Sequence, residues 1–311
     1  MRADSDLSEI RWHAGGLNNG VIFGLTRFGV VHMPRGCSYG IGHVGTWLAF
    51  RLMRAGTEAV VANLRAVRPD ASELELRALA LRTYRSYAKD TIDFIGNLDA
   101  NQSELSRWVA RHDDAPLRAL LARGRGVILA GGHFGNWELG GVVLRVLNGH
   151  PLLIVGKPEA SSAVGEIRRR MRDSLGIETL EIGQMLETAL RIRRHLAANG
   201  IVAMLLDRHV GRDRVDVSFF GRRTSFLRTP AMIAGLSGAP LLPAFLVRQR
   251  DNRFAGDFGE PIYVDPGDRT DAALRNATQA FATQLEQRIR ANPQCWYQFY
   301  RYWEPDACGN G

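Results

Sequence analysis

Two kinds of hydrophobic pattern follow one another along this chain. From about residue 17 to residue 95, apolar residues recur at the three- and four-residue spacing of amphipathic helices, as in IGHVGTWLAFRLM and ELELRALALRTYRSYAKDTIDFI. Beyond this part, short apolar runs alternate with helical stretches; the runs are GVILAGG, PLLIVG, GIVAMLLD and PLLPAFLV. A last helical pattern, DAALRNATQAFATQLEQRIR, precedes an aromatic tail.

Apolar strands that alternate with helices are typical of an α/β fold with a mixed, largely parallel sheet flanked by helices. We therefore expect a helical N-terminal region, residues 1–95, packed on an α/β core, residues 96–311. In such sheets, ligands bind beyond the carboxyl ends of the strands. Because His133 and Asp207 each follow a predicted strand, we expect both to lie at that edge.

The first apolar stretch, GVIFGLTRFGVVHMP, is too short to cross a bilayer and contains Arg27. It fits either an ordinary core helix or a helix that lies on a membrane. We expect residues 21–33, flanked by Arg11 and Arg35, to insert partly into an anionic bilayer. The polar opening MRADSDLSEIRWHAGG is not expected to be a signal peptide.

The charge of the chain favours an anionic partner. Its 311 residues have a net charge of +8, and 45% of them are hydrophobic, as in a globular protein. Lys89 and Lys157 are the only lysines, so 40 − 2 = 38 of the basic residues are arginine. Codon bias explains part of this excess, and the forked grip of arginine on phosphate fits the rest. Anionic lipid, nucleic acid and an acidic carrier protein all fit this charge.

The cysteine pattern gives neither a metal site nor a disulfide framework. The three cysteines are widely separated, and no HExxH or clustered Cys/His motif accompanies them; they are Cys37, Cys295 and Cys308. We therefore expect a reducing compartment and no bound metal.

The segment GGHFGNWELGG places His133 and Glu138 five positions apart. Within one helix these side chains would point roughly 140° apart, so they can meet only if His133 precedes the helix and Glu138 lies in its first turns. A carboxylate that orients an imidazole makes it a general base. Such a spacing also arises often by chance, which leaves a structural histidine as the alternative. Since no GxSxG motif or neighbouring cysteine supplies a nucleophile, the base would act on a hydroxyl of the substrate.

Arginines gather in two places. The segment LLDRHVGRDRVDVSFFGRRTSFLRTP places six of them around two phenylalanines, which indicates either phosphate recognition or a solvated loop. In IRRRMRD, Arg168 and Arg172 share one helix face. No nucleic-acid-binding motif accompanies these clusters, so no nucleic-acid partner is expected.

Four motifs of this chain resemble motifs of the bacterial lipid A late acyltransferases and the related phosphatidylinositol mannoside acyltransferases, within the glycerolipid acyltransferase superfamily. They occur along the chain in the same order as in that family. HFGNWE resembles the family's H-x4-[DE] motif, and LLDRHVGRDRVDVSFFG its Asp-containing loop with a phenylalanine doublet. GLSGAPLLPAF resembles its late strand, and PQCWYQFYRYW its aromatic C-terminal signature. The chain departs from the family at Tyr300, where a histidine is usual, and in having no convincing membrane-spanning helix at its start.

This resemblance implies a membrane-associated acyltransferase that moves a fatty acyl chain from an acyl thioester to a hydroxyl of a glycolipid or phospholipid. His133 would be the general base and Glu138 its orienting carboxylate, with the oxyanion bound by backbone N–H groups after Gly135. The residues expected to bind substrate are Asn136, Arg172, Asp207 and Arg208.

The resemblance also implies the partners and the location. No cofactor is expected beyond the acyl donor, which is acyl-acyl carrier protein or acyl-CoA. The expected location is the cytoplasmic face of the bacterial inner membrane, as a peripheral or monotopic protein. The acceptor stays open between a lipid A-type and a mannoside-type glycolipid, and so does the oligomeric state. Three readings of other classes compete: a basic nucleic-acid-binding protein, a lipid-binding protein without turnover, and a lipid hydrolase.

Overall fold

The computed structural model describes residues 20–97, 100–111, 113–156, 162–181, 185–209, 211–268 and 270–303. Arg11, which was expected to flank the membrane-inserted stretch, lies outside these residues, and so do Lys157 and Cys308.

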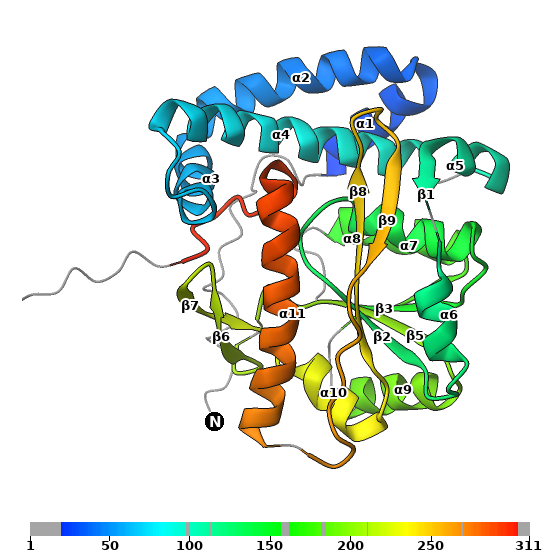
Figure 1. Cartoon of the computed structure of the whole chain (residues 1–311). Helices are drawn as coiled ribbons and strands as arrows, with labels where there is room; N and C mark the ends of the chain where they lie inside the picture. Colours follow the sequence, from blue (N-terminus) through cyan, green and yellow to red (C-terminus); the bar gives the residue numbers. More distant parts are fainter. Residues whose placement is uncertain are drawn as a thin grey trace, which may run out of the picture.

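Four helices form the N-terminal part of the described chain: α1 (Gly20–His32), α2 (Arg35–Leu52), α3 (Arg54–Val67) and α4 (Glu73–Gly96). The long helix α4 begins at a capping box, in which the Ser72 hydroxyl accepts from the backbone N–H of Glu75 and the Glu75 carboxylate accepts from that of Ser72. Helices α1, α2 and α3 all pack against α4. In Figure 1, α2 lies along the outer side of α4, at the edge of the molecule.

The core is a mixed sheet with seven strands among the described residues, in the order β1-β9-β8-β2-β5-β3-β4. Strands β8, β2, β5, β3 and β4 run parallel, β9 is antiparallel to β8, and β1 is parallel to β9. The strands are β1 (Val109–Arg111), β2 (Val127–Gly131), β3 (Leu152–Gly156), β4 (Ile177–Glu181), β5 (Ile201–Leu205), β8 (Leu241–Arg248) and β9 (Phe254–Phe258).

Both faces of the sheet are covered by helices (Figure 1). The helices that follow α4 are α5 (Gln102–Trp108), α6 (Ala115–Leu121), α7 (Trp137–Val146), α8 (Ser162–Ser174), α9 (Met185–Ala197), α10 (Thr229–Ser237) and α11 (Asp271–Ala291), before the 3-10 turn η1 (Pro293–Cys295). Strand β2 is buried throughout. Its Val127 and Leu129 pack in the cluster that contains α6, whereas Ile128 and Ala130 pack with α9, α10 and α11. This two-sided burial explains its continuous apolar sequence.

The α/β fold with a helical N-terminal region is thus confirmed. The four apolar runs form β2, β3, β5 and β8, and the last helical pattern forms α11. The sequence analysis missed the short edge strands and the hairpin of β6 (Val215–Phe219) and β7 (Arg222–Phe226), which pairs outside the main sheet.

Within the described residues, no helix combines the length and the apolar character needed to cross a membrane.

Candidate active site

The loop between β2 and α7 carries His133 and is fixed by contacts on both sides. Gly135 has a φ of +66°, and a Cβ there would lie 2.3 Å from the carbonyl oxygen of Leu246 in β8, so only glycine fits. The N–H of Gly135 donates to the carbonyl of Cys295 at 2.8 Å, and the N–H of Tyr297 donates to the carbonyl of His133 at 2.8 Å. The backbone at His133 is therefore held by β8 and by the C-terminal segment.

Neighbouring strands bring His133 and Asp207 together. Strands β2 and β5 are parallel, and Gly131 is in register with Leu205, so His133 and Asp207 each lie two residues beyond the paired ends. Asp207 is fully buried. Its Oδ1 lies 2.7 Å from Nδ1 of His133, and its Oδ2 accepts from the backbone N–H of His133 at 2.9 Å. Gln298 donates to the same Oδ2 at 2.9 Å.

The protonation states of this pair follow from burial and from the neighbouring charges. Burial lowers the pKa of His133 and Arg208 lowers it further, against the opposing charges of Asp207 and Glu138. Burial alone would raise the pKa of Asp207, but its contacts with His133 and the charge of Arg208 bring the pKa below its ordinary value. An ionised carboxylate only accepts, so Nδ1 of His133 carries the hydrogen and Nε2 carries the lone pair. This is the tautomer that a general base requires.

Glu138 lies in the first turn of α7, as expected, and contacts arginines of α8. Arg172 Nη2 is 2.8 Å from Oε1 and 2.9 Å from Oε2 of Glu138, and Arg168 Nη1 is 3.8 Å from Oε1. These arginines hold the pKa of Glu138 below its ordinary value despite burial, which would raise it. The carboxylate that contacts Nδ1 of His133 is Asp207, at the end of β5, whereas the motif alone indicated Glu138. Glu138 raises the pKa of His133 through its charge.

Two of the residues expected to bind substrate, Arg208 and Asn136, make hydrogen bonds that hold the segments around the site together. Arg208 is buried between Asp207 and the C-terminal segment, where its Nε donates to Gln298 Oε1 at 2.9 Å and its Nη2 to the carbonyl of Tyr297 at 2.9 Å. Burial lowers the pKa of Arg208. Asn136 caps α7: its Oδ1 accepts from the N–H of Leu139 at 3.1 Å, and its Nδ2 donates to a backbone carbonyl of α4 at 2.9 Å. Both ends of the Asn136 amide are thus used inside the protein.

The backbone N–H groups expected to bind an oxyanion are also in use at the start of the loop. Gly135 donates to Cys295, and Asn136 donates to the carbonyl of Leu246 at 2.8 Å. The N–H of Leu139 is capped by the Asn136 side chain. An oxyanion at this helix would therefore face the N–H groups of Trp137 and Glu138, in the first turn of α7.

The C-terminal segment contributes residues that the sequence analysis did not assign to the site. The Tyr302 hydroxyl donates to the carbonyl of Asp207 at 2.6 Å, and Gln298 bridges Asp207 and Arg208. From α7, the ring of Trp137 lies edge-on to His133, with 5.2 Å between ring centroids. Gln298 and Tyr302 belong to the aromatic tail PQCWYQFYRYW, which the sequence analysis singled out as a motif. The composition of this tail does not indicate that it folds back onto the site.

The arginine-rich segment, which indicated either phosphate recognition or a solvated loop, contains the β6–β7 hairpin. Its Phe219 and Phe220 pack in the main core with Trp296 and Trp303. The hairpin's Arg223 pairs with Asp216 on the surface of the same hairpin. The phenylalanine doublet is therefore a packing feature.

A buried ionic cluster joins α4, β8 and α2 beside the site. Arg248 lies 2.5 Å from carboxylate oxygens of both Asp90 and Asp93. The Tyr297 hydroxyl donates to Asp90 at 2.6 Å, and Arg35 of α2 lies 2.6 Å from Asp93. Burial raises the pKa of Asp90. Because the backbone N–H of Tyr297 also donates to the carbonyl of His133, Tyr297 links this cluster to the loop that carries His133.

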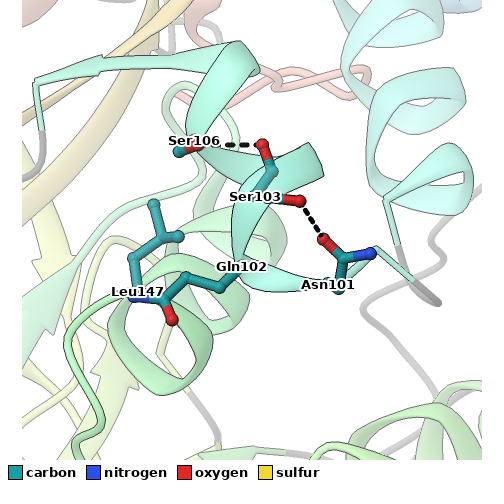
Figure 2. A pocket seen from close by; sticks show the side chains of 5 residues that line it. All are labelled: Asn101, Gln102, Ser103, Ser106 and Leu147. Carbon is teal, nitrogen blue, oxygen red and sulfur yellow. Dashed lines mark hydrogen bonds between the residues drawn. The ribbon is translucent and has the colours of Figure 1, made fainter.

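One hollow in the described surface lies away from this pair. It has a volume of about 440 Å³ and is lined by Asn101, Gln102, Ser103, Ser106 and Leu147 (Figure 2). Leu147 follows the last residue of α7, roughly 15 Å along the helix axis from the helix start beside His133. The lining consists of amide, hydroxyl and leucine side chains and contains no charged residue. In the described residues, no three His, Cys, Asp or Glu side chains come together as a metal site.

The chain is similar to known acyltransferases over most of its length. Residues 19–304 match the family described as bacterial lipid A biosynthesis acyltransferase. A phosphatidylinositol mannoside acyltransferase of Mycobacterium tuberculosis (strain ATCC 25618 / H37Rv) is 31% identical over 192 residues, which is 61% of this chain and 58% of the relative. A phosphatidylinositol mannoside acyltransferase of Mycolicibacterium smegmatis is 29% identical over 286 residues, 88% of both chains.

The match with the Mycobacterium tuberculosis relative thus spans little more than half of its length, whereas the family match runs through both the helical region and the sheet. It includes His133, Glu138, Arg172, Asp207 and the aromatic tail. The chain therefore belongs to the bacterial lipid A biosynthesis acyltransferase family.

Proposed function

We propose that this protein transfers a fatty acyl chain from an acyl thioester to a hydroxyl of a glycolipid, with His133 as general base and Asp207 as the carboxylate that orients it. The observation that carries the proposal is the hydrogen bond of 2.7 Å between Asp207 and Nδ1 of His133, at the carboxyl edge of the sheet. A neutral imidazole, partly exposed and turned by a buried carboxylate, is suited to take a proton from a substrate.

In the reaction, Nε2 of His133 removes the proton as the acceptor oxygen attacks the thioester carbonyl carbon. The tetrahedral intermediate places negative charge on the former carbonyl oxygen, near the N-terminal turn of α7. When the intermediate collapses, the C–S bond breaks and the thiolate takes the proton from His133. The ester is formed without a covalent enzyme intermediate, which fits a sequence with no GxSxG motif and no cysteine next to His133.

The acceptor class rests on the family. The family description names lipid A, and the two relatives are named for phosphatidylinositol mannoside, so each name refers to a lipid that carries sugar. We therefore propose a glycolipid hydroxyl as acceptor. The donor is acyl-CoA or an acyl carrier protein; both are anionic and suit a chain of net charge +8.

We also propose that the protein works as a peripheral protein on the cytoplasmic face of the inner membrane. A glycolipid acceptor resides in a membrane, and acyl thioesters are made in the cytoplasm. The protein would therefore meet both substrates at that surface.

The test is to supply purified protein with acyl-CoA or acyl-acyl carrier protein and with candidate glycolipids, and to identify the product by mass spectrometry. Lipid extracts of a deletion strain, compared with the parent, show which lipid loses an acyl chain. Transfer to one glycolipid, matched by the loss of that acyl chain in the deletion strain, is the expected result. Release of fatty acid without transfer would instead identify a hydrolase.

A further inference from the structure

The outward face of α2 is apolar along its length. Ile41, Val44, Leu48 and Leu52 are exposed by 60%, 62%, 44% and 77%. Their spacing of three or four residues places them on one face of the helix, over roughly 17 Å at 1.5 Å per residue. Such a contiguous row of large exposed side chains marks an interaction surface.

The inward face of α2 is fixed by polar contacts. Arg35 lies 2.6 Å from Asp93, and the Tyr39 hydroxyl donates to the same carboxylate at 2.7 Å. Burial and the charge of Asp93 raise the pKa of Tyr39. The helix thus holds charged and polar groups against α4 and turns apolar groups outward, the reverse of the usual arrangement at a water-facing surface.

The charged side chains at the end of α2 and the start of α3 are basic. Arg51 and Arg54 lie there, and residues 20–57 contain no aspartate or glutamate, whereas Arg35 is paired with Asp93 on the inward side. Trp47, on the flank of the apolar row, is 44% exposed, and the guanidinium of Arg51 lies 5.1 Å from its ring. An apolar row bordered by tryptophan and arginine matches the boundary between acyl chains and anionic headgroups.

The position of α2 also suits such a surface. Helix α2 packs on α4, and α4 carries Asp90, which binds Tyr297 next to His133. Helix α4 thus contacts both α2 and the C-terminal segment beside His133, and Figure 1 shows α2 along the outer side of α4.

We propose that the outer face of α2, formed by Ile41, Val44, Leu48 and Leu52, docks on an anionic lipid bilayer with the helix axis parallel to the membrane plane. The choice of a bilayer rests in part on the proposed function, because a glycolipid acceptor would be drawn from it. This surface differs from the one expected in residues 21–33. In α1, Phe28 is exposed by 66%, but Val30 packs against the buried cluster of α4 and α7.

The experiment compares two matched pairs of substitutions in the full-length protein. Leu48→Ser/Leu52→Ser alters the α2 face, and Leu190→Ser/Leu236→Ser makes the same change at leucines of α9 and α10, which are exposed by 42% and 49%. Binding is measured by flotation with vesicles of phosphatidylglycerol and phosphatidylcholine. The α2 pair should bind at least about tenfold more weakly than wild type, since the partial insertion of two leucine side chains is lost. The control pair should bind like wild type.

A charge variant tests the second element of the surface. Arg51→Gln/Arg54→Gln should weaken flotation at low salt and leave little difference at high salt, where exposed charges are screened. The circular dichroism spectrum and urea midpoint of each variant report whether it is folded. Equal flotation of the α2 pair and wild type, or an equal loss in the α2 and control pairs, would overturn the proposal.

Acyl transfer to a detergent-dispersed glycolipid, measured on the same preparations, separates this inference from the proposed function. Normal transfer together with unchanged flotation of the α2 pair contradicts the docking surface alone. Absent transfer together with selective loss of flotation contradicts the acyltransferase alone. Sedimentation velocity tests a second copy of the chain as occupant: a wild-type dimer that the α2 pair dissociates, with vesicle binding intact, would also overturn the proposal.

Discussion

Asp207 holds His133 at two points: its Oδ1 lies 2.7 Å from the ring Nδ1, and its Oδ2 lies 2.9 Å from the backbone nitrogen. One carboxylate thus fixes both the imidazole and the loop that carries it. Glu138, which is only five residues from His133 in the chain, accepts a hydrogen bond from Arg172 at 2.8 Å. The carboxylate at Nδ1 of His133 therefore comes from the end of the neighbouring strand β5 and not from the HFGNWE segment.

This arrangement predicts different losses of activity for three substitutions. His133→Ala should lower kcat by about 10²–10⁴-fold, because the proton acceptor is lost. Asp207→Asn should cause a loss of about the same size, because an amide neither fixes the Nδ1–H tautomer nor stabilises the imidazolium. Glu138→Gln, which removes a negative charge that raises the pKa of His133, should cost about tenfold or less in kcat. The measurement is steady-state acyl transfer by purified proteins with native circular dichroism spectra.

The double variant His133→Ala/Asp207→Asn should be little worse than the more damaged single variant, because the two residues act as one unit. If folded Glu138→Gln lost as much activity as Asp207→Asn, the orienting role would belong to Glu138, as the sequence alone suggested.

The pH dependence of the reaction should reflect the lowered pKa of His133, whose side chain is largely buried. A general base works only when it is neutral, so kcat/KM should rise as pH increases through the pKa of His133 and then level off. Because burial lowers this pKa, the midpoint should lie below the ordinary value of 6.5. In Asp207→Asn, a negative charge that raises the pKa is removed, so the midpoint of the residual activity should move to lower pH. A midpoint above 6.5 in the wild type would contradict this assignment.

The sequence predicted the central strands well because burial on both faces leaves a continuous apolar run, as in Val127 to Gly131. It missed β4, whose sequence IETLE has an apolar residue only at every third position. It placed His133 and Asp207 at the same edge because both follow a strand, but strand order is not encoded locally. Without the knowledge that β2 and β5 are neighbours, the nearer carboxylate, Glu138, was the natural choice.

The contacts of the C-terminal tail with the site could not be predicted from local sequence patterns for the same reason. Gln298 and Tyr302 lie 91 and 95 residues from Asp207 in the chain, and only the fold brings them to it. The glycines of GGHFGNWELGG indicate that another group comes close to the backbone there. The sequence does not indicate that this group is strand β8.

Glu138 and Arg172 should behave as a coupled pair in stability measurements. Their side chains are exposed by only 12% and 16%, so removing one charge leaves the other poorly solvated. Glu138→Gln should lower the free energy of unfolding by about 2–3 kcal/mol, and adding Arg172→Gln should cost little more. Urea denaturation of the two single variants and the double variant gives the coupling energy. Strictly additive losses would contradict the pairing.

The activity of a further variant, Arg172→Ala, tests whether Arg172 also binds substrate. Arg172→Ala should raise the acceptor KM more than it lowers kcat if its guanidinium provides mainly uniform binding. A collapsed kcat with an unchanged KM would remove Arg172 from the substrate-binding residues.

The loop before α7 offers a matched test of why glycine is required there. Gly135 and Gly124 have similar positive φ values, +66° and +71°, but a Cβ at Gly124 would meet no atom within 4 Å, whereas at Gly135 it would lie 2.3 Å from the carbonyl oxygen of Leu246. Gly124→Ala should therefore cost about 1 kcal/mol of stability, the strain of a left-handed backbone. Gly135→Ala adds a clash with the backbone of β8, which can be relieved only by moving the loop that carries His133. It should cost more than about 3 kcal/mol and should also lower kcat in the molecules that remain folded, whereas Gly124→Ala should leave kcat unchanged. Urea denaturation and acyl transfer on both variants provide the comparison, and equal effects at the two positions would contradict the role given to the contact between Gly135 and Leu246.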